Sequence, residues 1–133
     1  MTANQPGKPP TLSGISQVSM RALDLDRAIS FYSDVLGLDL LSKHDDMAFV
    51  LAGSMRIMLA LPPSPEFDHP GSVLYFDSRD IAADCEALRS LGVEIVREPF
   101  VAHSEDNHEF WLAFFRDSEG NTLGFTQWRR LVA

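Results

Sequence analysis

The sequence predicts an α+β fold of two tandem βαβββ modules, whose strands form a curled mixed sheet around a cavity. A strand-like segment at 14–22 precedes a capped helix, and a second strand at 72–77 precedes another. A short pattern also occurs twice, as LGLDL at 36–40 and LGVEI at 91–95. Two copies of one unit, each with one apolar face to bury, predict two sheets that leave their more polar faces around a shared cavity.

The first module is expected at 12–61. Alternation in its first strand places Gln17, Ser19 and Arg21 on a mostly polar face, and Val18 and Met20 on an apolar face. We expect helices to cover the apolar face.

The remaining elements of this module follow from turn and cap residues. Asp24 is a typical N-cap for a helix through Leu36, and Gly37 ends that helix. Three further strands are expected at 38–41, 47–51 and 56–61.

A proline-rich linker at 62–71 separates this unit from the second module, at 72–130. The expected elements are a strand at 72–77, a helix from Asp80 to Leu91, a strand at 93–96, a polar excursion at 98–108, and a closing hairpin that pairs 111–115 with 122–127. Residues 1–11 contain three prolines and are interpreted as a disordered leader.

Charge and composition restrict the partners. The formal net charge of −8 argues against nucleic acid and anionic membranes, which would repel the protein. Its one cysteine, Cys85, cannot form an internal disulfide, and the sequence contains neither a membrane-spanning apolar run nor a signal peptide. We therefore expect a cytoplasmic protein whose partner is a small organic molecule or another protein.

Two motifs carry a family resemblance: DLDRAISFY at 24–32, leading to VLGL at 35–38, and FRDSEGN at 115–121. In both, the chain resembles the vicinal oxygen chelate superfamily, which includes glyoxalase I, extradiol dioxygenases and the bleomycin and fosfomycin resistance proteins. The resemblance covers residues 14–127 and implies the fold described above and a homodimer. It does not select a reaction.

Catalytic members of this superfamily bind a divalent metal through the first and last strands of each module. The resemblance places those positions at Gln17, Val73, Gly124 and one residue between Ile57 and Leu59. Only Gln17 has a good ligand atom, because the thioether of Met58 suits soft metals. We therefore expect no metal site of the family type and no cofactor.

The predicted ligand-binding set combines the polar face of the first strand with the matching face of the fifth strand and one aromatic residue: Gln17, Ser19, Arg21, Tyr75, Asp77 and Trp111. The Arg21 position resembles one that anchors a substrate carboxylate in glyoxalase I. The alternative is an Arg21–Asp77 ion pair that only satisfies the interior. The aromatic cluster around Trp111 is interpreted as core and dimer contact, or as a surface that stacks on a flat ligand.

Three functions remain open at this stage. The first is binding or sequestration of a drug or metabolite without a metal, as in bleomycin resistance proteins. The second is an enzyme: a metal-dependent lyase, isomerase or dioxygenase that uses displaced ligands among His103, His108 and Glu109, or a metal-free acid–base catalyst. A solvated acidic loop is the simpler interpretation of those three residues. The third is a partner-binding or regulatory module with a closed cavity. No catalytic residue is assigned.

Overall fold

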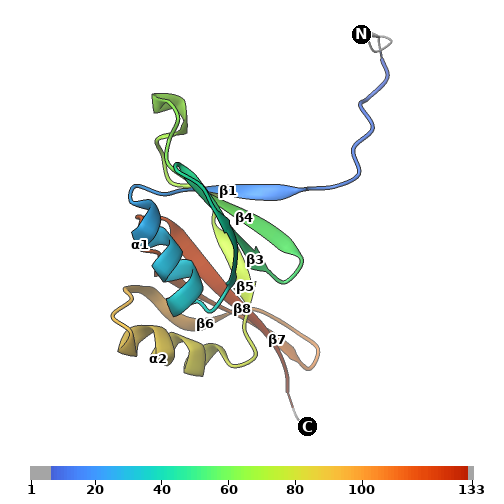
Figure 1. The fold of residues 1–133 in the computed structure, drawn as a ribbon. Helices are drawn as coiled ribbons and strands as arrows, with labels where there is room; N and C mark the ends of the chain where they lie inside the picture. The colour runs from blue at the N-terminus through green and yellow to red at the C-terminus, as the bar shows by residue number, and fades with distance from the viewer. Residues whose placement is uncertain (1–6, 132–133) are drawn as a thin grey trace.

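The two halves of the chain repeat one topology in the computed structural model, which describes residues 7–131 (Figure 1). The first module contains β1 (Gln17–Arg21), α1 (Leu25–Ser30) with its π-helical continuation η1 (Phe31–Val35), β2 (Asp39–Lys43), β3 (Met47–Ala52) and β4 (Met55–Ala60). The second contains β5 (Leu74–Asp77), α2 (Ile81–Ser90), β6 (Ile95–Glu105), β7 (His108–Arg116) and β8 (Thr122–Arg130). A short 3-10 turn, η2 (Pro65–Phe67), lies in the linker.

Each module forms its own four-stranded mixed sheet. The strand orders are β1-β4-β3-β2 and β5-β8-β7-β6, and the first strand of each module pairs in parallel with the last. The other neighbours are antiparallel. This arrangement confirms the predicted pair of βαβββ modules.

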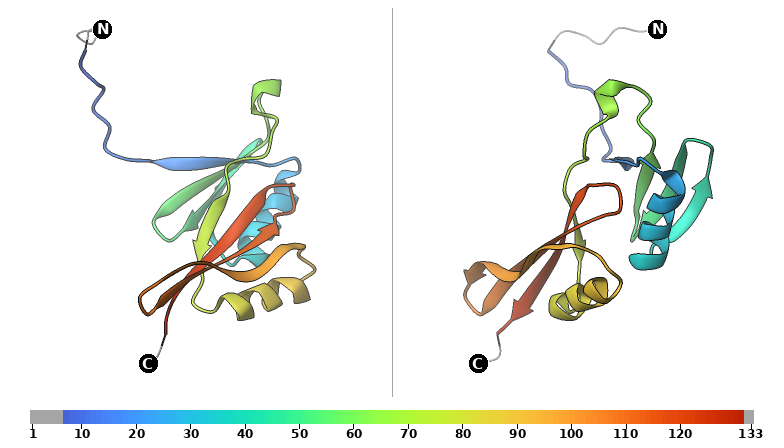
Figure 2. Two further views of the ribbon diagram at one scale, coloured as in Figure 1. Left: turned by 180° about the vertical axis from the view of Figure 1, so that it is seen from behind. Right: turned by 90° about the vertical axis from the view of Figure 1, so that its left-hand side faces the viewer.

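The predicted helix boundaries depend on side-chain caps. The carboxylate of Asp24 accepts a hydrogen bond from the backbone N–H of Arg27, and Asp80 does the same for Ala83. After α1 and η1 the chain turns at Gly37, whose φ of 74° is strained for any residue with a side chain. Each helix covers one face of its own sheet (Figure 2).

The predicted polar excursion at 98–108 is wrong. These residues form most of β6, the first residue of β7 and the tight turn at 106–107 between them, in which Asp106 has a φ of 48°. Most of their side chains are exposed, so the segment has no apolar face to reveal its strands. Breaks in register within β6 disturb its alternation further.

One hydrophobic core joins the modules. It contains the apolar face of β1, the inner side of α1 and η1, and the helix-facing side of β7 and β8. Tyr32, Phe115 and Leu123 are completely buried in it. Among the described residues, no helix is both long and apolar enough to cross a membrane. Part of the predicted leader, residues 1–6, lies outside the described chain.

Candidate functional site

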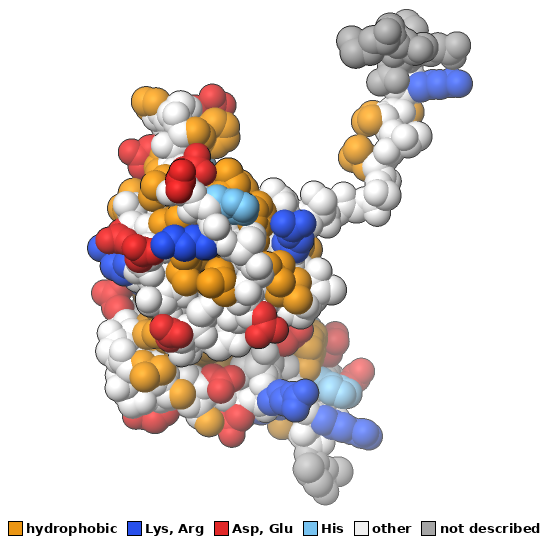
Figure 3. Space-filling model, viewed as in Figure 1, with side chains coloured by type: hydrophobic (Ala, Val, Ile, Leu, Met, Phe, Trp, Pro, Cys, Tyr) orange, Lys and Arg blue, Asp and Glu red, His pale blue; other side chains and the backbone are white. Residues whose placement is uncertain are grey.

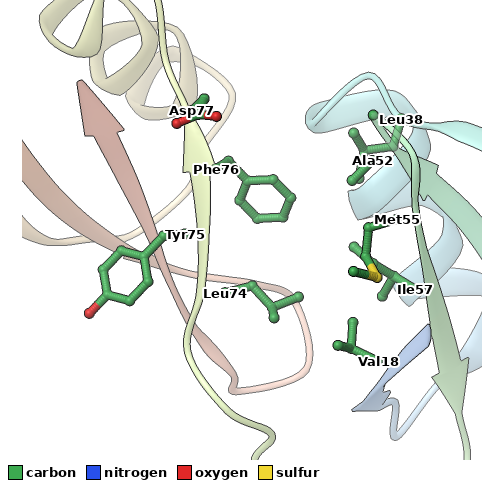
Figure 4. Close-up of a pocket in the computed structure, with 10 residues that line it drawn as sticks. Val18, Leu38, Ala52, Met55, Ile57, Leu74, Tyr75, Phe76 and Asp77 are labelled. Carbon is green, nitrogen blue, oxygen red and sulfur yellow. The ribbon is translucent and has the colours of Figure 1, made fainter. Parts of the chain in front are cut away.

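A large apolar cavity of about 510 Å³ lies between the two modules, beside the core that joins them. Val18, Met55 and Ile57 line it from the first module, and Leu74 and Phe76 point toward them from β5 (Figure 4). These are the apolar faces of the strands. The sequence predicted a shared cavity enclosed by the polar faces of the two sheets. In the structure, the apolar faces enclose the space between the modules of one chain.

The polar face of β1 lines a different hollow, of about 310 Å³. Its other wall is the linker 62–71, which we call the strap. Its lining residues come from β1, from β3 and β4, and from the strap, and include Ser19, Arg21, Met47, Met58, Phe67 and His69. We call this hollow the strap pocket, and it is the candidate functional site.

Arg21 is the cation of the strap pocket. Its Nη1 lies 3.0 Å from Oδ1 of Asp68 on the strap, and its side chain is only 15% exposed, against 55% for Asp68. Its Nε is buried and has no hydrogen-bond partner among the described residues. The alternative Arg21–Asp77 pair is not formed: Asp77 instead accepts a hydrogen bond from Thr126.

The turn between β7 and β8 fixes the backbone around Arg21. Asn121 donates from Nδ2 to the carbonyl of Arg21, and its Oδ1 accepts from the backbone N–H of Gly71 at the end of the strap. Asp117 holds Asn121 in turn, accepting from its backbone N–H and its Nδ2. One buried amide thus connects the strand carrying Arg21, the strap and the second module.

Asp117 also accepts a hydrogen bond from the hydroxyl of Tyr32, at 2.7 Å. Burial, together with the neighbouring carboxylate of Asp117, raises the pKa of Tyr32 far above its usual range. The phenol therefore remains a neutral donor, and this bond attaches η1 to the turn.

Glu119 binds the same turn to the start of α1. Its fully buried carboxylate accepts from the backbone N–H groups of Leu23 and Asp24 and forms an ion pair with Arg27, at 2.7 Å. Burial alone would raise the pKa of Glu119, but the hydrogen bonds from Arg27, Ser118 and the two backbone groups lower it to about 2. Glu119 is therefore ionised, and its role is structural.

The family metal positions do not offer a fitting donor set. Gln17 and Met58 lie together on the open face of the first sheet, with Nε2 and Sδ 3.9 Å apart. Val73 supplies only hydrocarbon, and the ring of Tyr75 covers Gly124. Divalent ions such as Zn²⁺, Mg²⁺ and Ca²⁺ are held by nitrogen, oxygen or thiolate ligands, and one amide beside a thioether does not provide a set of them. Within residues 7–131, no group of three or more His, Cys, Asp or Glu could hold a metal ion.

Tyr75 and Trp111 lie on opposite faces of the second sheet. Tyr75 points away from the first module (Figure 4) and packs edge-on against Phe114. Trp111 packs against the core, donates to Glu109 and lies under Arg129. The open face beside Tyr75 is aromatic: Phe114 contacts both Tyr75 and Phe100, and Phe110 contacts Trp128. The structure thus places Gln17, Ser19 and Arg21 together, Tyr75 and Asp77 on the other module, and Trp111 apart from both groups.

The three residues considered as displaced ligands lie at the far end of the β6–β7 hairpin. His103 is 3.4 Å from Glu105, His108 is opposite Glu105, and Glu109 bonds to Trp111. Gln17 belongs to the other module. These residues do not converge on one point in the chain.

Sequence reasoning missed the residues that the strap contributes. Phe67, Asp68 and His69 join Arg21 only because the linker folds back over the first sheet. The one available signal was the density of prolines, which indicates a stiff segment but not its path.

Acidic and basic side chains are scattered among hydrophobic ones over the face shown in Figure 3. With a net charge of −8, the protein repels anions at long range. Recognition of an anion must therefore come from a nearby cation that is largely buried, and Arg21 is such a cation.

Comparisons with known proteins agree with the fold. The model of the glyoxalase/bleomycin resistance protein/dioxygenase superfamily matches residues 14–125. A lactoylglutathione lyase from Haemophilus influenzae is 29% identical over 126 residues, covering 85% of this chain and 91% of the relative. The solved structure of a superfamily member from Alicyclobacillus acidocaldarius has a TM-score of 0.68 at 18% identity and covers 87% of this chain and 92% of its own.

A solved lactoylglutathione lyase from Agrobacterium tumefaciens has a TM-score of 0.64 at 21% identity, covering 90% of this chain and 96% of its own. At these identities the solved structures support the fold alone. The family match spans most of the sequence and both modules of the structure. The chain therefore belongs to the glyoxalase/bleomycin resistance protein/dioxygenase superfamily.

Proposed function

We propose that this protein binds a small organic anion in the strap pocket without the metal of its catalytic relatives, and so sequesters a drug or metabolite. The observation that carries the proposal is Arg21, a largely buried guanidinium that lines a pocket of ligand size and has Asp68 as its one ion-pair partner among the described residues. A carboxylate and a guanidinium form a strong, charge-assisted hydrogen bond, so an anionic ligand group suits this position.

The walls of the pocket suit an organic body behind the anionic group. Met47, Met58 and Phe67 provide flexible and aromatic apolar surface, and Ser19 adds one hydroxyl. We expect a ligand with a planar or apolar portion and one carboxylate, sulfonate or phosphate.

We further propose a cytoplasmic homodimer. The aromatic open face of the second sheet leaves Tyr75 and Trp128 about half exposed, at 51% and 55%. A patch of this kind typically marks a contact surface. Sedimentation velocity on the wild type and on Trp128→Glu tests the dimer: the variant should sediment as a monomer, and a wild type that is already monomeric would reject it.

A metal-dependent lyase is the second candidate, and the lactoylglutathione lyase of Haemophilus influenzae, at 29% identity, favours a lyase. It would require ligands beyond Gln17, because the other family positions lack hard donors. Elemental analysis of protein purified without chelator separates the candidates. A stoichiometric divalent ion that Gln17→Ala removes would favour the lyase.

Isothermal titration with 2-naphthoate and 2-naphthamide tests the binding proposal, because the two molecules share a shape and differ in charge. The carboxylate should bind saturably and the amide should not. The Arg21→Gln variant should abolish binding of 2-naphthoate. Equal binding of both molecules would reject an anion site.

A further inference from the structure

We infer that Asp68 is a built-in competitor for Arg21: an organic anion that enters the strap pocket displaces the Asp68 carboxylate and releases the strap. This inference rests on the proposed function and concerns the regulation of the same site. It starts from the position of Asp68, whose carboxylate already stands where a ligand anion would meet the guanidinium.

The two partners of the ion pair differ in their access to water. Arg21 is 15% exposed, whereas Asp68 is 55% exposed. When the pair separates, Asp68 recovers its hydration at little cost, while Arg21 would be left largely desolvated and without an anion. The pair therefore opens when another anion takes the place of Asp68.

The strap is held mainly at its ends. The backbone N–H of Leu61 bonds to the carbonyl of Asp46 at one end, and that of Gly71 to Asn121 at the other. Between them, among the described residues, the Asp68 carboxylate is the only side-chain group of 63–70 that bonds to a strand. The hydrogen bonds of Phe67 and Asp68 backbone groups stay inside the strap.

Four prolines at 62, 63, 65 and 70 stiffen this segment. Residues 63–70 are all exposed, so the strap carries no buried side chain that would hold it in place. Loss of the Asp68 contact should therefore free the whole segment to move about its two ends.

Competition by Asp68 also selects the class of ligand. The strap holds the Asp68 carboxylate near Arg21 at an effective concentration in the millimolar range or above. A small free anion therefore gains no binding free energy by replacing it. An anion whose body contacts Met47, Met58 and Phe67 adds apolar burial to the exchange. The site should thus discriminate 2-naphthoate from acetate.

The experiment compares Asp68→Asn with Asp26→Asn, a matched control that breaks the exposed Lys43–Asp26 pair and changes the net charge equally. By titration, Asp68→Asn should bind 2-naphthoate about tenfold more tightly than the wild type, a difference of about 1.4 kcal/mol. The control should match the wild type. In the Asp68→Asn background, Arg21→Gln should remove the gain.

Hydrogen exchange of the strap amides gives a second measurement that needs no ligand. Exchange at Phe67 and Asp68 should be faster in Asp68→Asn, and in the wild type saturated with 2-naphthoate, than in the free wild type. If 2-naphthoate binds through Arg21 but Asp68→Asn changes neither affinity nor exchange, the competitor role is rejected and the binding site stands. If neither protein binds 2-naphthoate and exchange is unchanged, both proposals fail.

Discussion

The ring of Tyr75 lies directly against the backbone of Gly124. A Cβ built on Gly124 would be 2.8 Å from Cδ1 of Tyr75 and 3.3 Å from the carbonyl oxygen of Ala113. The absence of a side chain at 124 therefore lets an aromatic ring cover a position where catalytic relatives would be expected to carry a metal ligand.

We predict that Gly124→Ala lowers the free energy of unfolding by about 1–3 kcal/mol, because the new methyl group overlaps the ring of Tyr75. In a Tyr75→Ala background the same change should be nearly neutral, since only the Ala113 carbonyl remains close. Urea denaturation of the four proteins measures the coupling. If the losses of unfolding free energy from Gly124→Ala and Tyr75→Ala simply add, the ring of Tyr75 is not what the new methyl group meets.

Glu119→Gln should destabilise the protein by about 3 kcal/mol at pH 7, because it removes a fully buried carboxylate that accepts from the backbone N–H groups of Leu23 and Asp24 and pairs with half-exposed Arg27. Glu94→Gln, which removes the exposed partner of Arg116, is the matched control and should cost less than about 1 kcal/mol. Thermal and urea unfolding provide the comparison. If both variants lost the same free energy of unfolding, Glu119 would not be what holds the 117–121 turn to the start of α1.

The same residue predicts a dependence on pH. The pKa of Glu119 is lowered from 4.5 to about 2, so the folded state favours the ionised carboxylate. Its contribution, roughly 3 kcal/mol, is complete above pH 4.5 and is lost as the pH falls toward 2. The stability difference between wild type and Glu119→Gln should therefore shrink over this range. A difference that stays constant from pH 6 to pH 3 would assign the loss to packing.

Asn121→Ala should cost about 2–4 kcal/mol, because the buried amide serves the Arg21 carbonyl, the Gly71 N–H and Asp117 together. It should also speed hydrogen exchange at Gly71. Asn107→Ala, in the exposed β6–β7 turn, serves as control and should change stability by less than about 0.5 kcal/mol. Unchanged exchange at Gly71 would mean that the strap is held elsewhere.

Local signals in the sequence predicted most of the fold. Asp24 and Asp80 cap the helices as expected, and the alternation in β1 separates buried Met20 from exposed Gln17 and Ser19. The β6–β7 hairpin escaped prediction because its far half buries little on either face. Its pairing is visible only in the backbone hydrogen bonds.

The site was predictable only in part, for a physical reason. Alternation alone placed Arg21 on a polar face, but its partner Asp68 is 47 residues away and reaches it only through the path of the strap. Likewise the turn 117–121 was recognised as a hairpin turn. That Glu119 binds the start of α1, across more than 90 residues, is a property of the assembled modules.

This long separation has a consequence for how the protein is made. A chain emerging from the ribosome delivers β1, α1 and the strap well before it delivers the turn that anchors all three. Until residues 117–121 have been synthesised, the first module exposes the donors of Leu23, Asp24 and Arg27 to water, and Arg21 has no amide to fix its backbone. The strap pocket can therefore take its final shape only after the ribosome has released residues 117–121.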